Sequence, residues 1–268
     1  MKTARFPVLN IELFQSLKLT LVRNLHIPKK TELLLTIFLI ISCMAGWGQK
    51  KLPDSFNIRS ASFFLPQPLP KGHYSSCISV LYVVTPRDWT DDVITAPMFY
   101  YQAKYTLPKS FNVQASLATL FISNRITLGP FWNYKINDNN YAGVGWQVVW
   151  NYGILNQFGF STQITGWEQQ PSLTWGHVFG TYAFSVKGNL YWTNKLYFIE
   201  GKSSIPTANP FINGYGITLN FDQKLYKNRA FTLGFNMSYL RYHIVAWPAF
   251  PVNQKRYWIP EFQFGLAL

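Results

Sequence analysis

Charged side chains are scarce in this 268-residue sequence, and acidic ones are the scarcest. Asp and Glu number 11 against 24 Lys and Arg, and the four types make up 13% of the chain, about half the share usual in soluble globular domains. Hydrophobic residues reach 48%, which excludes an intrinsically disordered chain. The mean hydropathy is near zero, which excludes a protein built from several helices of about 20 apolar residues each.

Cysteine and the common catalytic motifs are also rare or absent. The two cysteines are Cys43 and Cys77, and this number excludes a disulfide framework, a cysteine-based zinc site and a CxxC redox motif. The sequence contains no GxxxxGK[ST], no HExxH and no GxGxxG after a strand. We therefore expect no cofactor and no resident metal.

The net charge of +13 does not by itself indicate a nucleic-acid partner. The first 48 residues hold six basic and two acidic residues, so their removal lowers the net charge by four, to +9. The remaining Lys and Arg are scattered along the chain, whereas a phosphate-binding surface needs several cations on one face. We expect no binding of nucleic acid.

What the sequence does contain begins with a targeting segment. The basic pair at 29–30 precedes an apolar run over 33–41, and small residues follow it. This order is that of a secretory signal peptide, and the run is too short to cross a bilayer. Gly46 and Gly48 supply the small residues at −3 and −1, so we expect cleavage before Gln49.

Two further features bear on this segment. Residues 40–43 resemble a lipobox, and in that alternative Cys43 would be the lipidated first residue of the mature chain. Residues 1–28 precede the basic pair and are unusually long for a signal of this kind. We predict an N-terminal extension plus signal peptide over 1–48 and a single β-barrel domain over 49–268.

Beyond residue 55 the dominant period is two, which is typical of β-strands whose two faces meet different surroundings. Between 142 and 152 one parity is apolar or aromatic and the other is Gly, Gln and Asn, with Val149 as the exception. In the next segment Phe158, Phe160, Thr162 and Ile164 share the apolar parity. The same alternation recurs over 214–222, 231–239 and 261–268.

Alternation also suits a soluble antiparallel sandwich, but three features favour a membrane barrel. Most segments run about 10–14 residues, as tilted transmembrane strands do. The polar parity consists of Gly, Ser, Thr, Asn and Gln, which fits a polar lumen. Aromatic residues lie near many strand ends, as in an interfacial girdle: Trp132, Tyr134, Trp150, Tyr152, Trp192, Tyr215, Tyr239 and Trp258.

Turn signals divide the chain into segments. Short polar turns are predicted at 123–124, 137–140, 193–195 and 227–229, and longer Pro-bearing links at 66–72, 202–211 and 244–255. The strands are predicted near 57–65, 75–84, 96–107, 111–122, 125–136, 140–152, 154–166, 173–192, 196–201, 212–226, 229–243 and 256–268. The expected fold is an all-β, antiparallel transmembrane barrel of about twelve strands, and ten is also consistent because parity is poorly defined over 173–201.

The signal segment, the alternating strands and a terminal strand with Phe262, Phe264, Leu266 and Leu268 on one parity together resemble Gram-negative outer-membrane β-barrel proteins. The terminal strand is similar to the signal that the barrel-assembly machinery reads, which usually ends in Phe or Trp and here ends in Leu268. The resemblance implies a location in the outer membrane, contact with its lipid, and the assembly machinery as a partner during insertion.

The function predicted first is a non-enzymatic barrel: a narrow channel, or a structural or binding barrel of the cell envelope. Trp146, Val148 and Trp150 are expected to face lipid. Residues of the opposite parity are expected to line the lumen, and these are Gln147, Asn151, Gln157, Gln163, Asn220, Asn236 and Gln263.

The alternative function is a membrane-embedded lipid hydrolase of the outer-membrane phospholipase or deacylase type. His73 and Ser75 would share one face of an extended backbone and form its catalytic pair. The phospholipase type usually follows the Ser with Asn-Gly, and Ser76-Cys77 stand here instead. His177, between Trp175 and Phe179, is expected to be packed rather than catalytic.

Two loops have weaker alternatives. The carboxylates within 87–92 are numerous enough to hold Ca²⁺, but a solvated loop with a local Arg-Asp pair is the favoured interpretation. The aromatic, Pro-stiffened stretch over 246–251 would fold over the barrel mouth or stack on a sugar ring, and the first is favoured.

Overall fold

The computed structural model describes residues 58–90, 93, 95–156, 161–205, 210–226, 229–245 and 255–268. The predicted signal segment, its lipobox, Gln157, the carboxylates of Asp91 and Asp92 and the loop over 246–251 lie outside the described residues. In the described part of the chain, no helix is both long and apolar enough to cross a membrane.

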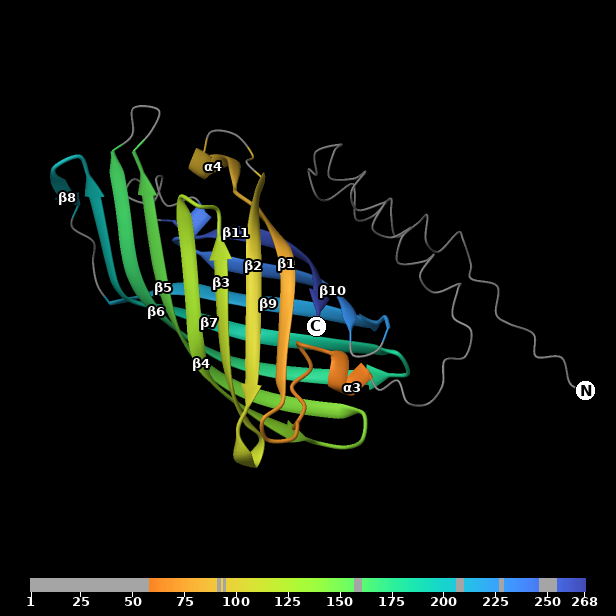
Figure 1. Ribbon diagram of the computed structural model, residues 1–268. Helices are drawn as coiled ribbons and strands as arrows, with labels where there is room; N and C mark the ends of the chain where they lie inside the picture. The colour runs from red at the N-terminus through yellow and green to blue at the C-terminus, as the bar shows by residue number, and fades with distance from the viewer. Residues whose placement is uncertain are drawn as a thin grey trace, which may run out of the picture. The chain divides into compact units, whose positions relative to one another are not determined.

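Within the described residues, ten antiparallel strands close into a barrel (Figure 1). Each strand pairs with the next along the chain, β6 pairs with β7, and the ring closes where β1 pairs with β11. The short β8 (Ser203–Ile205) pairs only with the end of β7. The ten strands are β1 (Tyr74–Val84), β2 (Thr95–Thr106), β3 (Phe111–Thr119), β4 (Ser123–Lys135), β5 (Asn140–Leu155), β6 (Thr162–Phe179), β7 (Tyr182–Glu200), β9 (Phe211–Lys224), β10 (Ala230–Leu240) and β11 (Tyr257–Ala267).

The barrel confirms the predicted fold class and the ten-strand alternative, and the count of twelve was too high. The three strands predicted over 154–201 are two long ones, β6 and β7. The turn between them contains Gly180, whose φ of +62° is easily adopted only by glycine. Asn194, predicted to lie in a turn, is instead a bulge inside β7, because Trp167 pairs with Lys195 and Glu168 with Thr193.

The strand predicted over 57–65 was also wrong. Ile58–Ala61 form the short helix α3, and Ser62 donates its backbone N–H to the carbonyl of Ile58 at 2.8 Å. Ile58, Ala61, Ser62, Phe63 and Leu65 are all buried, at both odd and even positions. Because buried residues occur at both parities, the apolar pattern of this segment does not distinguish a strand from other backbone conformations.

The connections at the two ends of the barrel differ in length. The end that carries α3 and the C-terminus has the turns over 107–110, 136–139, 180–181 and 225–229. The other end has the links over 85–94, 120–122, 156–161, 201–210 and 241–256, which include the short helix α4 (Arg87–Thr90). In outer-membrane barrels the short turns face the periplasm and the longer loops face the outside.

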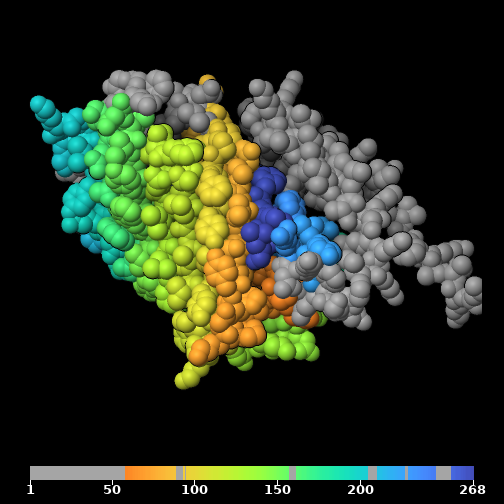
Figure 2. All heavy atoms as spheres, viewed as in Figure 1, coloured from red at the N-terminus to blue at the C-terminus, as the bar shows by residue number. Residues whose placement is uncertain are grey.

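Side chains alternate between the two faces of the barrel wall. On β5, Trp146 and Val148 are 47% and 43% exposed, while Gln147 and Asn151 are 7% and 2% exposed. Figure 2 looks onto the outer surface of the strands from β1 to β6, which lie side by side. Exposed apolar residues occur on each of these strands, including Ile78, Phe99, Leu117, Leu128, Val144 and Leu173. The outward face is therefore apolar, as contact with lipid requires.

Candidate functional site: a polar chamber inside the barrel

Residues 58–72, which we name the plug segment, enter the barrel at the end with the short turns; most of 58–67 is buried, and most of 68–72 is exposed. The Lys104 ammonium on β2 donates a hydrogen bond to the carbonyl of Phe63 at 2.7 Å, and the Asn133 amide on β4 donates one to the carbonyl of Gln67 at 3.0 Å. These anchors come from two strands of the wall that β3 separates, and they hold the segment against the inner face of the wall.

A third anchor joins the plug segment to β9. The Ser62 hydroxyl donates a hydrogen bond to one carboxylate oxygen of Asp222, and the Thr232 hydroxyl donates to the other at 2.7 Å. Asp222 is 2% exposed, so both of its oxygens need partners. One of these partners comes from the plug segment.

Two glycines of the wall make room for the plug segment. A Cβ at Gly143 would lie 2.8 Å from Pro66 Cβ, and a Cβ at Gly176 would lie 2.7 Å from Leu65 Cδ1 and from Pro66 Cδ. Any other residue at these positions would push against the plug segment. The close approach therefore depends on glycine at both positions.

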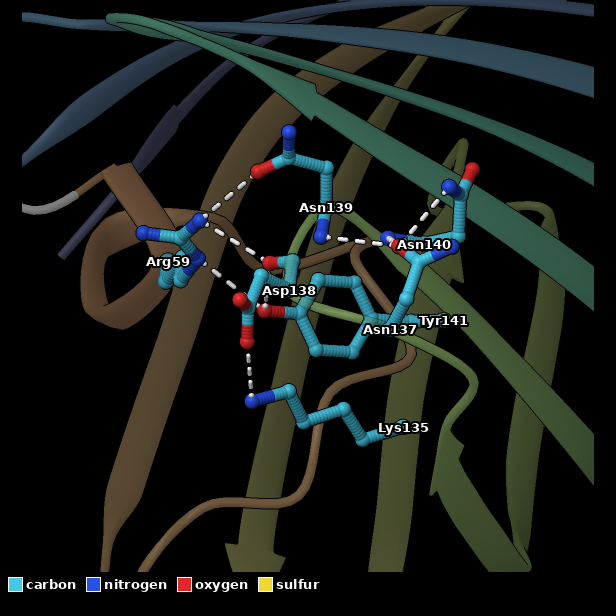
Figure 3. Close-up of polar contacts among 7 residues, drawn as sticks. All are labelled: Arg59, Lys135, Asn137, Asp138, Asn139, Asn140 and Tyr141. Carbon is cyan, nitrogen blue, oxygen red and sulfur yellow. Dashed lines mark hydrogen bonds and ion pairs between the residues drawn. The ribbon is translucent and has the colours of Figure 1, made fainter.

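The plug segment also contacts the turn between β4 and β5 (Figure 3). The Arg59 guanidinium donates hydrogen bonds to Tyr141 Oη at 3.0 Å, to the carbonyl of Asp138 at 2.9 Å and to Asn139 Oδ1 at 3.0 Å. The hydrogen bond from Lys135 lowers the pKa of the Asp138 carboxyl below its usual value.

An apolar cluster lies toward the other end of the lumen. It contains buried side chains of the wall and of residues 241–245, which follow β10. Asn213, a bulge residue on β9, fixes this segment by accepting the backbone N–H of Tyr242 at 2.8 Å and donating to the carbonyl of Tyr242 at 2.9 Å. The cluster includes Val83, Met98, Ile164, Leu196, Phe198, Leu240, Tyr242, Ile244 and Ile259.

Between the plug segment and this cluster is a chamber of about 140 Å³. Its wall is mostly amide, hydroxyl and aromatic groups, and Phe63–Pro66 of the plug segment line it from one side. Among the described residues that line it, the charged ones are Arg125, Lys187 and Glu261. A polar space of this size in a lumen is large enough to hold water or a small solute.

The charges of the chamber have different surroundings. Glu261 accepts hydrogen bonds from His243 Nε2 at 2.7 Å and from the Asn236 amide at 2.7 Å, so both of its oxygens have a partner. Lys187 donates to Gln147 Oε1 at 3.2 Å and lies 5.0 Å from the centre of the Phe131 ring. Arg125 lies 5.9 Å from the centre of the Tyr191 ring.

The residues predicted to line the lumen do not all lie on the inner face of the wall. Gln147, Asn220, Asn236 and Gln263 line the chamber, and Asn151 lines a smaller cavity beside it. Gln163 is on the outer face, because it lies opposite Ile154 of β5 and Ile199 of β7, which are both exposed. The predicted parity of that segment was inverted, and Thr162 and Ile164 are buried instead.

The sequence analysis missed Arg125, Lys187 and Glu261. A signal for two of them was present: Glu261 alternates with the aromatic residues of the last strand, and Arg125 stands near the start of a predicted strand. A charge on the inward parity of a membrane strand points to the lumen. Lys187 had no such signal, because it fell within the region of unresolved parity.

The proposed catalytic pair does not have the geometry of a nucleophile and its base. His73 Nε2 and Ser75 Oγ are both buried without a hydrogen-bond partner within the described residues, so they are not bonded to each other. Burial lowers the pKa of the His73 imidazole. The part of the chain that the structure describes contains no group of three His, Cys, Asp or Glu side chains able to hold a metal ion.

His177 is packed, as predicted. Its ring stacks with those of Trp175 and Phe179 at centroid distances of 6.1 Å and 5.9 Å, and Nδ1 lies 2.9 Å from Asn140 Oδ1.

No protein-family model matches this sequence, and no curated protein matches it. Solved structures with a similar fold include the KdgM porin, at 10% identity and a TM-score of 0.38, over 71% of this chain and 97% of that one. Neisserial surface protein A is similar at 12% identity and a TM-score of 0.34, over 73% and 96%. An outer-membrane channel from Pseudomonas putida F1 is similar at 7% identity and a TM-score of 0.37, over 82% and 100%.

At these identities the likeness concerns the fold alone. The closed ring of strands, the apolar exterior and the polar interior are features of this chain itself, and they are those of barrels that cross a bilayer. The chain is an antiparallel β-barrel with the apolar exterior and polar interior of a barrel that crosses a bilayer, as its sequence predicted.

Proposed function

We propose that this barrel is a non-enzymatic, narrow channel of the outer membrane of a Gram-negative-type cell, closed at its periplasmic end by the plug segment. The observation that carries the proposal is the polar chamber of about 140 Å³ between the plug segment and the apolar cluster. Side chains can fill the interior of a barrel of about eight strands, and the ten-strand barrel leaves more room, which here is lined mostly by polar groups.

The nature of the anchors supports a closure that can be released. Lys104, Asn133 and Asp222 hold the plug segment through hydrogen bonds, and no disulfide joins it to the wall within the described residues. Each hydrogen bond contributes only about 1 kcal/mol net, or up to about 3 kcal/mol when a charge is involved. Release of the plug segment also separates Ile58, Phe63 and Leu65 from the apolar side chains of the wall that they pack against, so the open state is populated only to a small extent.

The lipid hydrolase receives no support from a specific observation. Its nucleophile would be Ser75, which has the same parity as the buried Cys77 and Ser79 of β1, while the lipid lies on the other side of the wall. We also propose that the barrel-assembly machinery inserts the chain and that outer-membrane lipid surrounds it.

Planar bilayers test the proposal. We expect small, infrequent conductance steps for the wild-type protein and larger steps for Leu65→Asp, because a carboxylate cannot remain buried beside Gly176. Lys71→Asp is the control, since Lys71 is an exposed residue of the same segment. If neither the wild type nor Leu65→Asp conducts although both barrels are folded, the protein is a structural or binding barrel and not a channel.

A further inference from the structure

Lys187 is a cation inside the barrel without an acidic partner. The ion pairs among the described residues are Lys135–Asp138 and His243–Glu261, so Lys187 takes part in neither. The charged group that acts on its ammonium is the Arg125 guanidinium, which is a like charge. An enclosed cation is costly when nothing of opposite charge compensates it.

The carboxylate of the chamber does not supply this compensation. Both oxygens of Glu261 are bonded, one to His243 and the other to Asn236. Asp222, farther toward the short turns, is bonded to Ser62 and Thr232. Each oxygen of these acids already accepts a hydrogen bond from another donor, and neither acid forms an ion pair with Lys187.

Gln170 is a second residue of the chamber wall with hydrogen-bond donors. Gln170 is 6% exposed and lines the chamber, and its Nε2 has no hydrogen-bond partner among the described residues. It lies directly opposite Gln147, whose Oε1 accepts the hydrogen bond from Lys187. Lys187 itself pairs with Thr174, four residues from Gln170 along β6, and its ammonium reaches Gln147, which pairs with Gln170.

Arg125 approaches this place from the other side. Gln169 pairs with Trp192 and Ser172 with Asn189, so Gln170 lies opposite Tyr191 on β7. The Arg125 guanidinium lies over the Tyr191 ring at 5.9 Å. Arg125 is also attracted by Glu168 and Glu261, so it adds positive potential to the chamber, while Lys187 contributes the uncompensated charge.

We propose that the chamber is a binding site for a small oxyanion, such as a carboxylate or inorganic phosphate, held by Lys187, Gln170 and Arg125. Two N–H bonds of the Lys187 ammonium are not used by Gln147, and the unpartnered Gln170 amide in the wall of the same chamber supplies neutral donors. Charge-assisted hydrogen bonds of this kind are the stronger ones. The chamber, at about 140 Å³, accommodates a few non-hydrogen atoms and their water.

The site deepens the proposed channel by naming its class of solute, but binding is measurable without conduction. The probe is chloride, followed by ³⁵Cl⁻ NMR line broadening in a neutral detergent, with sodium acetate and sodium phosphate as competitors. We expect excess broadening for the full mature protein, displaced by either competitor. The same experiment on Leu65→Asp shows whether the plug segment limits exchange.

Four variants assign the broadening to the site. Lys187→Gln and Gln170→Glu should each remove at least about four fifths of it, since one deletes the cation and the other places a carboxylate in the wall of the same chamber. Lys187→Arg should retain it. Lys195→Gln is the control, because Lys195 is exposed on the outer side of β7 and its removal changes the net charge equally. Gln170→Glu also covers the case in which Lys187→Gln fails to fold, because it leaves Lys187 in place.

The outcomes separate the two proposals. Broadening that persists in folded Lys187→Gln and Gln170→Glu, or that disappears in Lys195→Gln, overturns the anion site whatever the conductance. Broadening that depends on Lys187 in a barrel that never conducts retains the site and removes the channel. If the anion site and the channel are both retained, Leu65→Asp should be anion-selective in a tenfold KCl gradient. Adding Lys187→Gln to this variant should lower that selectivity.

Discussion

The Lys104 ammonium and the carbonyl oxygen of Phe63 are 2.7 Å apart, and the same ammonium lies 5.1 Å from the centre of the Phe63 ring. A charged side chain of the wall is thereby bound to both the backbone and the side chain of the plug segment. Lys104 is 1% exposed, so this contact is its principal compensation for the loss of water. The association of plug and wall is therefore part of the stability of the barrel.

Lys104→Met should weaken this association. The substitution keeps much of the volume but leaves the Phe63 carbonyl without its donor, which costs about 1–3 kcal/mol. Urea unfolding in lipid vesicles measures the loss. Lys71→Met, in the exposed part of the plug segment, should change the free energy of unfolding by less than about 0.5 kcal/mol. Equal effects of the two substitutions would contradict the anchoring role of Lys104.

The orientation of β5 predicts a difference between the two faces of the wall. Val148→Arg places a cation on the lipid side and should cost about 2–4 kcal/mol if the site is near the bilayer midplane. Gln114→Arg is a depth-matched control: Gln114 lines the chamber, and it lies opposite Gly129, next to the Leu128 that pairs with Val148. Folding into lipid vesicles should tolerate Gln114→Arg much better, and similar costs would remove the membrane assignment of this face.

The strands were predictable where their two faces differ in polarity. β5 separates Trp146 and Val148 from Gln147, and its sequence contains that separation. The prediction failed over 154–201 for a physical reason: Ile164, Leu196 and Phe198 point into the lumen and belong to the apolar cluster. In the sequence, an apolar residue that points into the lumen looks like one that faces lipid. The predicted assignment of the two faces is therefore inverted in this region, and the turn at Gly180 cannot be located from alternation.

The site was only partly predictable for a related reason. Amide side chains that line the lumen, such as Asn220 and Gln263, can be predicted from alternation alone, because alternation shows which face of the strand a residue is on. The plug segment depends on contacts between residues distant in sequence, such as Ser62 with Asp222 and Asn133 with Gln67. No local pattern reports such pairs, and Gly176 reads as an ordinary strand glycine until Leu65 is placed against it.

Processing of the N-terminus remains a prediction of the sequence. We expect the mature protein to begin at Gln49, since Gly46 and Gly48 meet the small-residue requirement of signal cleavage. Intact-mass measurement on membrane-extracted protein decides this. A mass that retains residues 1–48 argues against the signal peptide, and a lipidated species beginning at Cys43 argues for the lipobox.

The absence of lipid hydrolysis is a further prediction. Purified wild-type protein should release no fatty acid from phospholipid vesicles, with or without Ca²⁺, because His73 and Ser75 are not hydrogen-bonded to each other. Activity that survives purification and disappears in both His73→Ala and Ser75→Ala, with unchanged heat-modifiable migration, would return the enzyme to first place.

The last prediction acts on the plug segment from the side of the wall. Gly176→Val adds a side chain where even a Cβ would lie 2.7 Å from Leu65 Cδ1 and from Pro66 Cδ. We expect the plug segment to be displaced while the strand pairing of β6 persists, since valine is well suited to strands. Planar bilayers should then record larger conductance steps than for the wild type, as for Leu65→Asp but without any new charge.

A matched glycine separates displacement of the plug segment from a general effect on the wall. Gly188 of β7 lies on the outer side, and a Cβ there would have its nearest neighbour at 4.0 Å, so Gly188→Val should leave conductance and heat-modifiable migration unchanged. If Gly176→Val folds and conducts no more than Gly188→Val, the plug segment is not what closes the lumen. The closure would then lie in the apolar cluster around Tyr242 and Ile244, which neither substitution touches.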